Sequence, residues 1–351
     1  MSYENGWAAL NMQFSSKIPR TEYSADGYHW KLMEAVTGID TSVPENRPRA
    51  SREFRKRWDY SFVWSILVER NFMKEAGAVI TDMGHAVYGE DDFNTSVTHP
   101  YQEPEDVYAL DPAEQFRFFD QKDLIARFER HYRNNCENIP DVVNMSGVYI
   151  TMFSGLIDLL GWDALLISLG TDVDRFNRLV DSYYHWIRQF FEALAKSSVP
   201  VVMVHDDLCW TSGPVAAPEW YRAQIFPKLA SLIGILKEAG KIVMFTSDGK
   251  IDEFFDDIVR LNVNSVVMEP CCDMERFAAT YGDRVGFVGG VDCRTLTYGS
   301  YDEIRFEVER AMEWGRRYPG FMLAVGNHLP ADVPVERALY YNELYEKLAY
   351  R

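Results

Sequence analysis

The chain has 351 residues and a formal net charge of −17, from 36 Lys and Arg against 53 Asp and Glu. This acidic balance argues against a nucleic-acid-binding protein, which carries a basic stripe, and against docking on anionic lipid. Hydrophobic residues make up 47% of the chain and charged residues 25%, as in ordinary folded proteins. The aromatic content of 14% fits either a large core or a pocket lined with rings.

No segment contains the roughly 20 consecutive apolar residues that a membrane span requires. The N-terminus has no basic segment followed by an apolar run, so no signal peptide is predicted. The five cysteines show no disulfide spacing, and we expect reduced thiols in a cytoplasmic protein.

The first half of the chain has an irregular pattern. Strands are predicted near 61–64, 78–81 and 142–148, and helices over 112–134 and 173–195. Residues 1–57 are expected to form a helical extension ahead of a single barrel domain over 58–351. Five arginines at helical spacing in this extension predict a charged, exposed helix face: Arg47, Arg49, Arg52, Arg55 and Arg57.

The second half alternates short apolar strands with helical patterns. Strands are predicted at 199–204, 241–246, 265–269, 285–289 and 321–325, and helices at 218–239, 251–261, 274–281, 300–317 and 335–349. Apolar strands that alternate with helices indicate parallel βα units. A doubly wound sheet and a barrel both fit, but eight strands favour the barrel, and no G-x-G-x-x-G follows a strand. The predicted fold is α/β: one (β/α)₈ TIM-type barrel with an irregular N-terminal extension.

Acids, histidines and cysteines follow the predicted strands, at the end where such folds place their chemistry. A pair of carboxylates can bind a metal or raise one another's pKa, although a single Asp often just caps a helix. We expect catalytic roles for His205, Asp206, Asp207, Asp248 and His328, and substrate contacts from Tyr149, Trp210, Cys271 and Asn327. For Cys271, the role of a small buried hydrophobe fits equally well.

His328 is the strongest single candidate, because an imidazole after a buried strand can bind a metal or donate a proton. One spacing that leads to it is suggestive: Asp292, then 14 residues, Glu307, then 20 residues, His328, which places Asp292 and His328 at the same rim. Glu307 falls within a predicted helix, where a solvent-exposed face is the ordinary alternative.

The strand-end motifs resemble those of the uroporphyrinogen decarboxylase superfamily. The similarity runs through VHDDLCWTSGP, FTSDG, MEPCCD, GGVDCRTLTYG and AVGNHLP in that order. The family fold is a (β/α)₈ barrel. The resemblance implies one of two chemistries: cofactor-free decarboxylation of a tetrapyrrole, or methyl transfer involving a corrinoid protein, often with zinc.

Departures from the family pattern favour the methyltransferase branch. The decarboxylase segment R-Q-A-G-R is absent near the N-terminus. Thiol-activating members bind zinc through His-x-Cys and a later Cys, but here those positions resemble Thr246, Asp248 and Asn327, which are poor soft ligands. Ether-cleaving members use acids and a histidine, as in the spacing of Asp292, Glu307 and His328.

The resemblance therefore implies methyl transfer from a small O-methyl donor, such as an aryl ether, to a Co(I) corrinoid carried by a partner protein, with zinc at the site. A homodimer is compatible with the sequence. Two alternatives stay open: a decarboxylase of uroporphyrinogen or a related acid, and a non-catalytic ligand-binding barrel.

Overall fold

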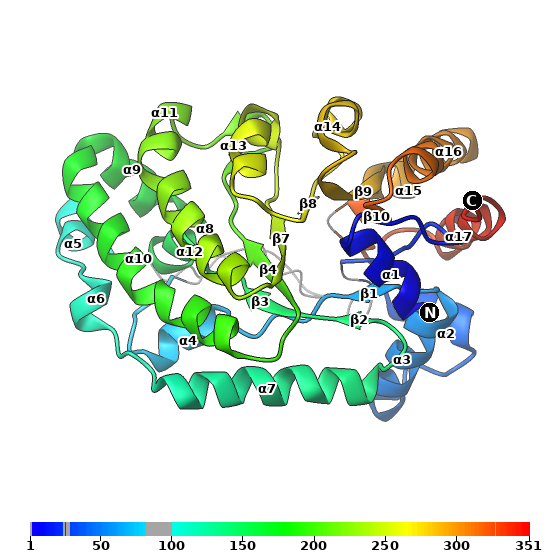
Figure 1. The fold of residues 1–351 in the computed structure, drawn as a ribbon, viewed down its shortest axis with the longest axis horizontal. Helices are drawn as coiled ribbons and strands as arrows, with labels where there is room; N and C mark the ends of the chain where they lie inside the picture. Colours follow the sequence, from blue (N-terminus) through cyan, green and yellow to red (C-terminus); the bar gives the residue numbers. More distant parts are fainter. Residues whose placement is uncertain (1, 24, 26–28, 82–99, 327) are drawn as a thin grey trace.

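The computed structural model describes residues 2–23, 25, 29–81, 100–326 and 328–351. Its main sheet has six parallel strands in the order β10-β9-β8-β7-β4-β3, and a second parallel pair joins β1 to β2 (Figure 1). The strands are β1 (Phe62–Val63), β2 (Val143–Asn144), β3 (Ser146–Val148), β4 (Val201–His205), β5 (Cys209–Trp210), β6 (Gly213–Pro214), β7 (Ile242–Thr246), β8 (Ser265–Val267), β9 (Gly286–Asp292) and β10 (Phe321–Gly326).

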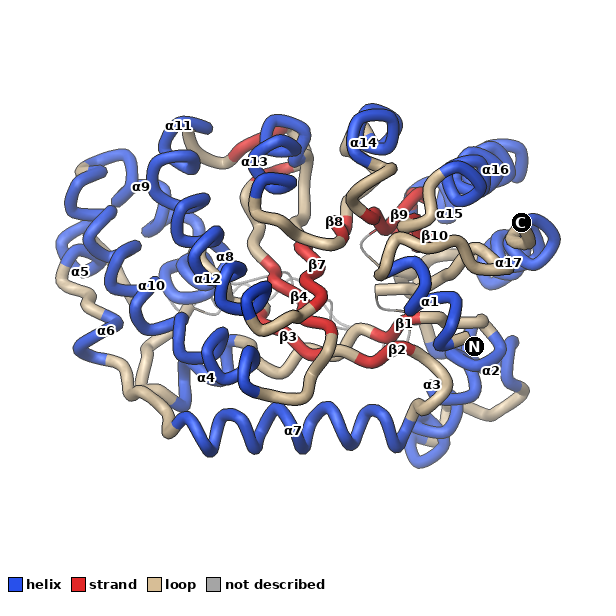
Figure 2. The backbone as a smooth tube through the Cα atoms, viewed as in Figure 1, coloured by secondary structure: helices blue, strands red, loops and turns tan. Residues whose placement is uncertain are grey.

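Helices surround these strands, and the N- and C-termini lie on the same side of the molecule (Figures 1 and 2). The helices of the first half are α1 (Tyr3–Leu10), α2 (Trp30–Thr37), α3 (Arg47–Arg57), α4 (Arg70–Glu75), α5 (Pro104–Tyr108), α6 (Pro112–Gln115), α7 (Gln121–Asn138), α8 (Phe153–Leu160), α9 (Trp162–Thr171) and α10 (Val173–Lys196). Those of the second half are α11 (Pro218–Trp220), α12 (Phe226–Glu238), α13 (Phe255–Arg260), α14 (Met274–Tyr281), α15 (Cys293–Tyr298), α16 (Tyr301–Arg317) and α17 (Val335–Leu348).

A short segment around Arg20 closes the ring of strands. Arg20 pairs in parallel with Leu323 of β10 on one side and with Tyr60, just before β1, on the other. The amide of Thr21 donates to the carbonyl of Leu323 (2.9 Å), and the amide of Ser61 donates to the carbonyl of Arg20 (2.8 Å). Because β2 continues into β3, which pairs with β4, the pairing runs around a complete circle. The predicted (β/α)₈ barrel is confirmed.

The barrel has an inner and an outer apolar core. The inner core fills the barrel and includes Ala9 and Leu10, so α1 packs against the interior side chains. It also contains one or two side chains from most strands: Phe62, Val143, Met145, Val201, Met203, Met244, Val288, Met322 and Ala324. The outer core lies between the strands and the surrounding helices. A packed interior of this kind leaves room for chemistry only at the ends of the strands.

Strand periodicity determines which side chains enter the barrel. On β4, Met203 belongs to the inner core, whereas Val202 and Val204 belong to the outer core. Since side chains alternate along a strand, His205 points to the interior at the carboxyl end. The register pairs His205 with Thr246 of β7, so these two side chains lie next to each other at the same rim.

The first half of the chain differs from its predictions. Residues 78–81 lie outside every described strand, and the segment around Arg20 supplies the barrel position instead. Arg20 lies within the segment 1–57 expected to form a helical extension ahead of the barrel over 58–351, yet it pairs with the barrel strands. The predicted helix over 112–134 is broken between α6 and α7, and the strand over 142–148 is divided into β2 and β3.

The arginine-rich segment forms α3, as predicted. Its buried residues are Ala50 and Phe54, whereas Arg49, Arg52 and Arg57 are exposed. Among the described residues, no single helix is long and apolar enough to cross a membrane, and one sharply bent pair, α8 with α9, meets the criteria of length and composition together.

Candidate functional site

A small cavity of about 30 Å³ lies at the carboxyl ends of the barrel strands. As it stands, it has room for about two water molecules. Three aromatic rings line it, together with two histidines and two acids: Tyr23, Trp64, Tyr149, His205, His328, Asp248 and Glu269. Thr246, Ser247, Met268, Val288 and Gly326 are among the other lining residues. The part of the lining that the structure describes contains no Lys and no Arg.

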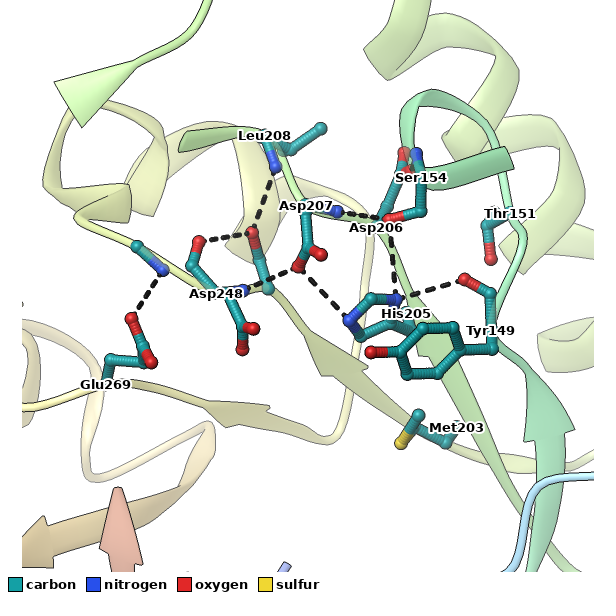
Figure 3. Close-up of polar contacts among 12 residues, drawn as sticks. Tyr149, Thr151, Ser154, Met203, His205, Asp206, Asp207, Leu208, Asp248 and Glu269 are labelled. Carbon is teal, nitrogen blue, oxygen red and sulfur yellow. Dashed lines mark hydrogen bonds and ion pairs between the residues drawn. The ribbon is translucent and has the colours of Figure 1, made fainter. Parts of the chain in front are cut away.

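His205 is held from three directions (Figure 3). Its Nδ1 donates to the carbonyl oxygen of Tyr149 (3.0 Å), and its Nε2 lies 3.1 Å from Oδ1 of Asp207. The ring of Tyr149 stacks on the imidazole with the centroids 3.8 Å apart. Burial lowers the pKa of His205, but the carboxylates of Asp207 and Asp248 outweigh burial and raise this pKa to about 9. The imidazole and Asp207 therefore form an ion pair at neutral pH.

Asp207 connects β4 to the loop after β7. Its Oδ1 accepts the backbone N–H of Asp248 (2.8 Å), and its own N–H donates to the hydroxyl of Ser154 (2.7 Å). Burial raises the pKa of Asp248 well above its ordinary value, and the nearby charges of Asp207 and Glu269 raise it further. The site therefore gathers three acids, Asp207, Asp248 and Glu269, around one imidazole, and this crowding favours the protonated form of Asp248.

Asp206 faces away from the cavity and has a structural role. Its Oδ1 accepts the backbone N–H groups of Met152 (3.2 Å) and Ser154 (2.8 Å), where α8 begins. Burial raises its pKa to about 7. Neither Asp206 nor Asp207 is among the described lining residues, but Asp207 contacts His205 and Asp248, which line the cavity, whereas the Asp206 carboxylate bonds to the start of α8.

The loops after β7 and β8 hold each other through Glu269. The N–H of Gly249 donates to Oε2 of Glu269 (2.7 Å), which also lies 3.9 Å from Sγ of Cys271. Cys271 is not among the described lining residues, but its thiol lies beside Glu269, which is one of them. The substrate contact expected from Cys271 stays a prediction.

Within the described ranges, one group of His, Cys, Asp or Glu side chains could hold a metal ion. It consists of His205, Asp207 and Asp248, whose ligand atoms all lie within 4.8 Å of one another. The metal set expected from the sequence spacing is different, and the structure does not bring its three members together.

Local hydrogen bonds explain why the expected metal set fails to assemble. Asp292 caps α15 by accepting the N–H of Arg294 (2.8 Å), and it pairs with the guanidinium of the same residue (2.7 Å). Glu307 accepts the N–H of Asp292 (2.8 Å) and the hydroxyl of Thr295 (2.8 Å). Both carboxylates fasten α15 and α16 to the barrel, while His328 lines the cavity.

His328 stands edge-on to Tyr23, with the ring centroids 5.9 Å apart. Burial lowers its pKa, so the ring is neutral at pH 7. Two other donors at the cavity, Trp64 Nε1 and Thr246 Oγ1, are buried and make no hydrogen bond with the described residues. A ligand oxygen in the cavity would satisfy them.

Of the remaining expected contacts, Tyr149 lines the cavity, but Trp210 does not. Trp210 is 44% exposed and packs against Trp162, with the ring centroids 5.6 Å apart. Asn327 lies outside the described residues. The sequence prediction missed Tyr23 and Trp64. Trp64 ends the predicted strand 61–64 and could have been found by the strand-end rule, whereas no pattern indicated Tyr23.

The sequence matches the family model of uroporphyrinogen decarboxylase (URO-D) over residues 78–347. Comparison with curated protein sequences found no match. Among solved structures, a methyltransferase from Methanosarcina mazei is similar over 99% of both chains, with 17% identity and a TM-score of 0.67. A GH113 β-1,4-mannanase is similar over 95% of this chain and 99% of that one, with 11% identity and a TM-score of 0.42. Since the family match spans most of the barrel, the chain belongs to the uroporphyrinogen decarboxylase family.

Proposed function

We propose that this protein is a methyltransferase that takes a methyl group from a small O-methyl donor, such as an aryl methyl ether, and passes it to a corrinoid protein. The observation that carries this choice is the lining of the cavity, whose described residues offer aromatic rings and acids but no Lys or Arg. The full-length similarity to a structure described as a methyltransferase supports the same branch of the family.

The main alternative is decarboxylation of uroporphyrinogen, and the charge of the cavity disfavours it. A substrate with many carboxylates is held by Arg and Lys. The described lining instead presents Asp248 and Glu269, and the residues outside the described ranges include no Lys or Arg in the sequence. An uncharged donor enters such a site without an electrostatic penalty.

The aromatic walls and the two unsatisfied donors suit an aryl ether. Tyr23 and Trp64 pack with their ring centroids 5.1 Å apart and offer a surface for an aromatic ring. Trp64 Nε1 and Thr246 Oγ1 can donate to the oxygens of the substrate. The small present volume requires side chains to move when the donor enters.

The reaction breaks the bond between the methyl carbon and the ether oxygen, and the electron pair of that bond stays on the oxygen. A reduced corrinoid bound on its partner protein supplies the electron pair that forms the new bond to the methyl carbon. The leaving oxygen needs a positive charge or a proton. In the ion pair of His205 and Asp207, Nε2 of His205 carries both a proton and a share of the positive charge. This nitrogen lies at the rim beside Thr246.

The proposal can be tested with cob(I)alamin and 2-methoxyphenol as probes. We expect the absorbance change of methylcob(III)alamin formation together with an equal amount of catechol, measured by chromatography. The variant Trp64→Phe keeps the ring but removes the donor, and we expect it to raise KM about tenfold with a smaller change in kcat. Release of carbon dioxide from uroporphyrinogen without any methyl transfer would identify a decarboxylase instead. Saturable binding of the ether without turnover would identify a binding barrel.

A further inference from the structure

We propose that His205, Asp207 and Asp248 bind one divalent transition-metal ion at the rim of the cavity, with Zn²⁺ as the best-matched ion. The inference rests on the proposed function and deepens it, because the ion would take the place of the proton on His205 as the positive charge that meets the leaving oxygen. The three residues share only Asp248 with the zinc positions that the family resemblance implies.

The ligand atoms are already close to the spacing that a metal requires. All three lie within 4.8 Å of one another, and Nε2 of His205 is 3.1 Å from Oδ1 of Asp207. In a tetrahedral zinc site with bonds of about 2.0–2.2 Å, two ligand atoms lie about 3.3–3.5 Å apart. Small side-chain rotations are therefore sufficient to admit the ion.

The surroundings of His205 have the arrangement that orients a metal-binding imidazole. Such a histidine nearly always donates its other ring N–H to a carbonyl or a carboxylate. Here Nδ1 donates to the carbonyl of Tyr149 (3.0 Å), which leaves the lone pair of a neutral ring on Nε2, facing Asp207. The stacked ring of Tyr149 fixes the plane of the imidazole, with an interplanar angle of 8°. The N–H of Asp248 donates to the carboxylate of Asp207, and the hydroxyl of Ser154 accepts the backbone N–H of Asp207, so this residue is also held in place.

An independent observation points to a further ligand at this place. Thr246 is 3% exposed, lies beside His205 in the strand register and lines the cavity, yet its hydroxyl makes no hydrogen bond with the described residues. A water molecule or a substrate oxygen bound to the metal would accept a hydrogen bond from that hydroxyl. Three protein ligands with one position open to the cavity match the pattern of catalytic zinc sites.

The donor set also restricts the kind of ion. One imidazole and two carboxylates suit Zn²⁺ or Mn²⁺ better than ions that prefer thiolates, and better than Ca²⁺ or Mg²⁺, which prefer oxygen alone. The carboxylate of Glu269, which also lines the cavity, adds to the negative potential that attracts a cation.

The test measures metal binding in the absence of any methyl donor or corrinoid. The full-length protein is stripped with a chelator and titrated with Zn²⁺ alone or Mn²⁺ alone, while bound metal is measured by plasma mass spectrometry and Tm by calorimetry. We expect about one Zn²⁺ per chain and a rise in Tm with metal concentration. Asp248→Asn and Asp207→Asn should each weaken binding by about 100-fold or more, whereas Asp248→Cys should keep zinc, because a thiolate replaces the lost ligand.

Glu307→Gln is the matched control, since it removes a carboxylate from the set expected by sequence spacing. We expect this variant to bind Zn²⁺ as the wild type does. Loss of metal in Glu307→Gln with retention in both Asn variants would overturn the proposal, and so would a wild-type chain that binds neither ion. In that last case methyl transfer could still occur with the proton on His205, so failure of the metal site and failure of the proposed function are distinguishable.

Discussion

Tyr149 orients His205 with two of its parts at once. Its backbone carbonyl accepts the Nδ1 proton of His205 at 3.0 Å, and its ring lies flat on the imidazole at 3.8 Å. In the neutral ring that a metal would bind, the carbonyl keeps the proton on Nδ1, and the ring of Tyr149 sets the plane in which Nε2 points to Asp207. One residue at the end of β3 thus prepares the reactive nitrogen at the end of β4 (Figure 3).

This relationship predicts that the ring of Tyr149 matters more than its hydroxyl for the orientation of His205. Tyr149→Phe keeps the stack and should bind Zn²⁺ nearly as the wild type does. Tyr149→Ala frees the imidazole and should weaken binding by about 10- to 100-fold, the range typical of residues that orient metal ligands. Competition with a chromophoric chelator measures the Zn²⁺ affinity of both variants. Equal affinities in the Ala and Phe variants would show that the backbone carbonyl alone orients the ring.

Gly249 allows the loop after β7 to place Asp248. Its φ of +78° lies in the left-handed region, and a Cβ at this position would lie 2.3 Å from the carbonyl oxygen of Cys209. Gly249→Ala should destabilise the fold by about 1–3 kcal/mol through backbone strain. It should also lower methyl transfer at least tenfold, because the loop must shift Asp248 and lose the bond to Glu269. Urea unfolding and the cobalamin assay check the two effects, and Gly170→Ala, where a Cβ meets open space, is the control.

Glu22 lies in the segment that closes the barrel and connects this segment to neighbouring elements by hydrogen bonds. The buried carboxylate accepts the N–H of Val325 (2.9 Å), the indole N–H of Trp58 (3.0 Å) and the hydroxyl of Tyr341 (3.0 Å). Glu22→Ala leaves these donors unsatisfied and removes an acid that interacts electrostatically with the buried guanidinium of Arg20, so we expect a loss of about 3–5 kcal/mol. Glu22→Gln keeps an acceptor and should cost about 1–2 kcal/mol. Equal unfolding free energies for the two variants, measured in urea, would contradict this role.

The sequence predicted the second half of the barrel well because its strands are continuous apolar runs separated by helices. Each central strand is buried on both faces, and this leaves a strong pattern in the residues. The closing segment around Arg20 leaves no such pattern, since one or two residues are enough to pair with Leu323 and Tyr60. The apolar run at 78–81 gave a false strand: Ile80 is buried, but Val79 is 61% exposed.

The candidate site was predictable only in part. The strand-end rule found His205, Asp207 and Asp248, because alternation along a strand places such residues at the rim. It did not decide which carboxylates face the cavity. Asp206 and Asp292 instead accept hydrogen bonds from backbone N–H groups at the starts of helices. The spacing of residues in the sequence does not indicate whether a carboxylate caps a helix or faces the cavity. Tyr23 enters the cavity through long-range packing of the N-terminal segment against the barrel.

Acid should destabilise the protein through His29, which caps α2. Its Nδ1 accepts the N–H of Leu32 (3.2 Å), and its Nε2 donates to the carbonyl of Val333 (2.7 Å), so the folded state requires a neutral ring. Burial lowers the pKa of His29 below 6.5. The unfolded chain therefore binds more protons as the pH falls through about 6.5, and the free energy of unfolding decreases in that range.

His29→Asn keeps a capping acceptor but does not titrate. Urea unfolding between pH 5 and 7.5 should show a smaller decrease for this variant than for the wild type. Because His131 and His328, whose pKa values burial also lowers, are present in both proteins, the difference reports on His29 alone. Parallel curves for the two proteins would show that His29 takes up protons equally in the folded and unfolded states, which would contradict this prediction.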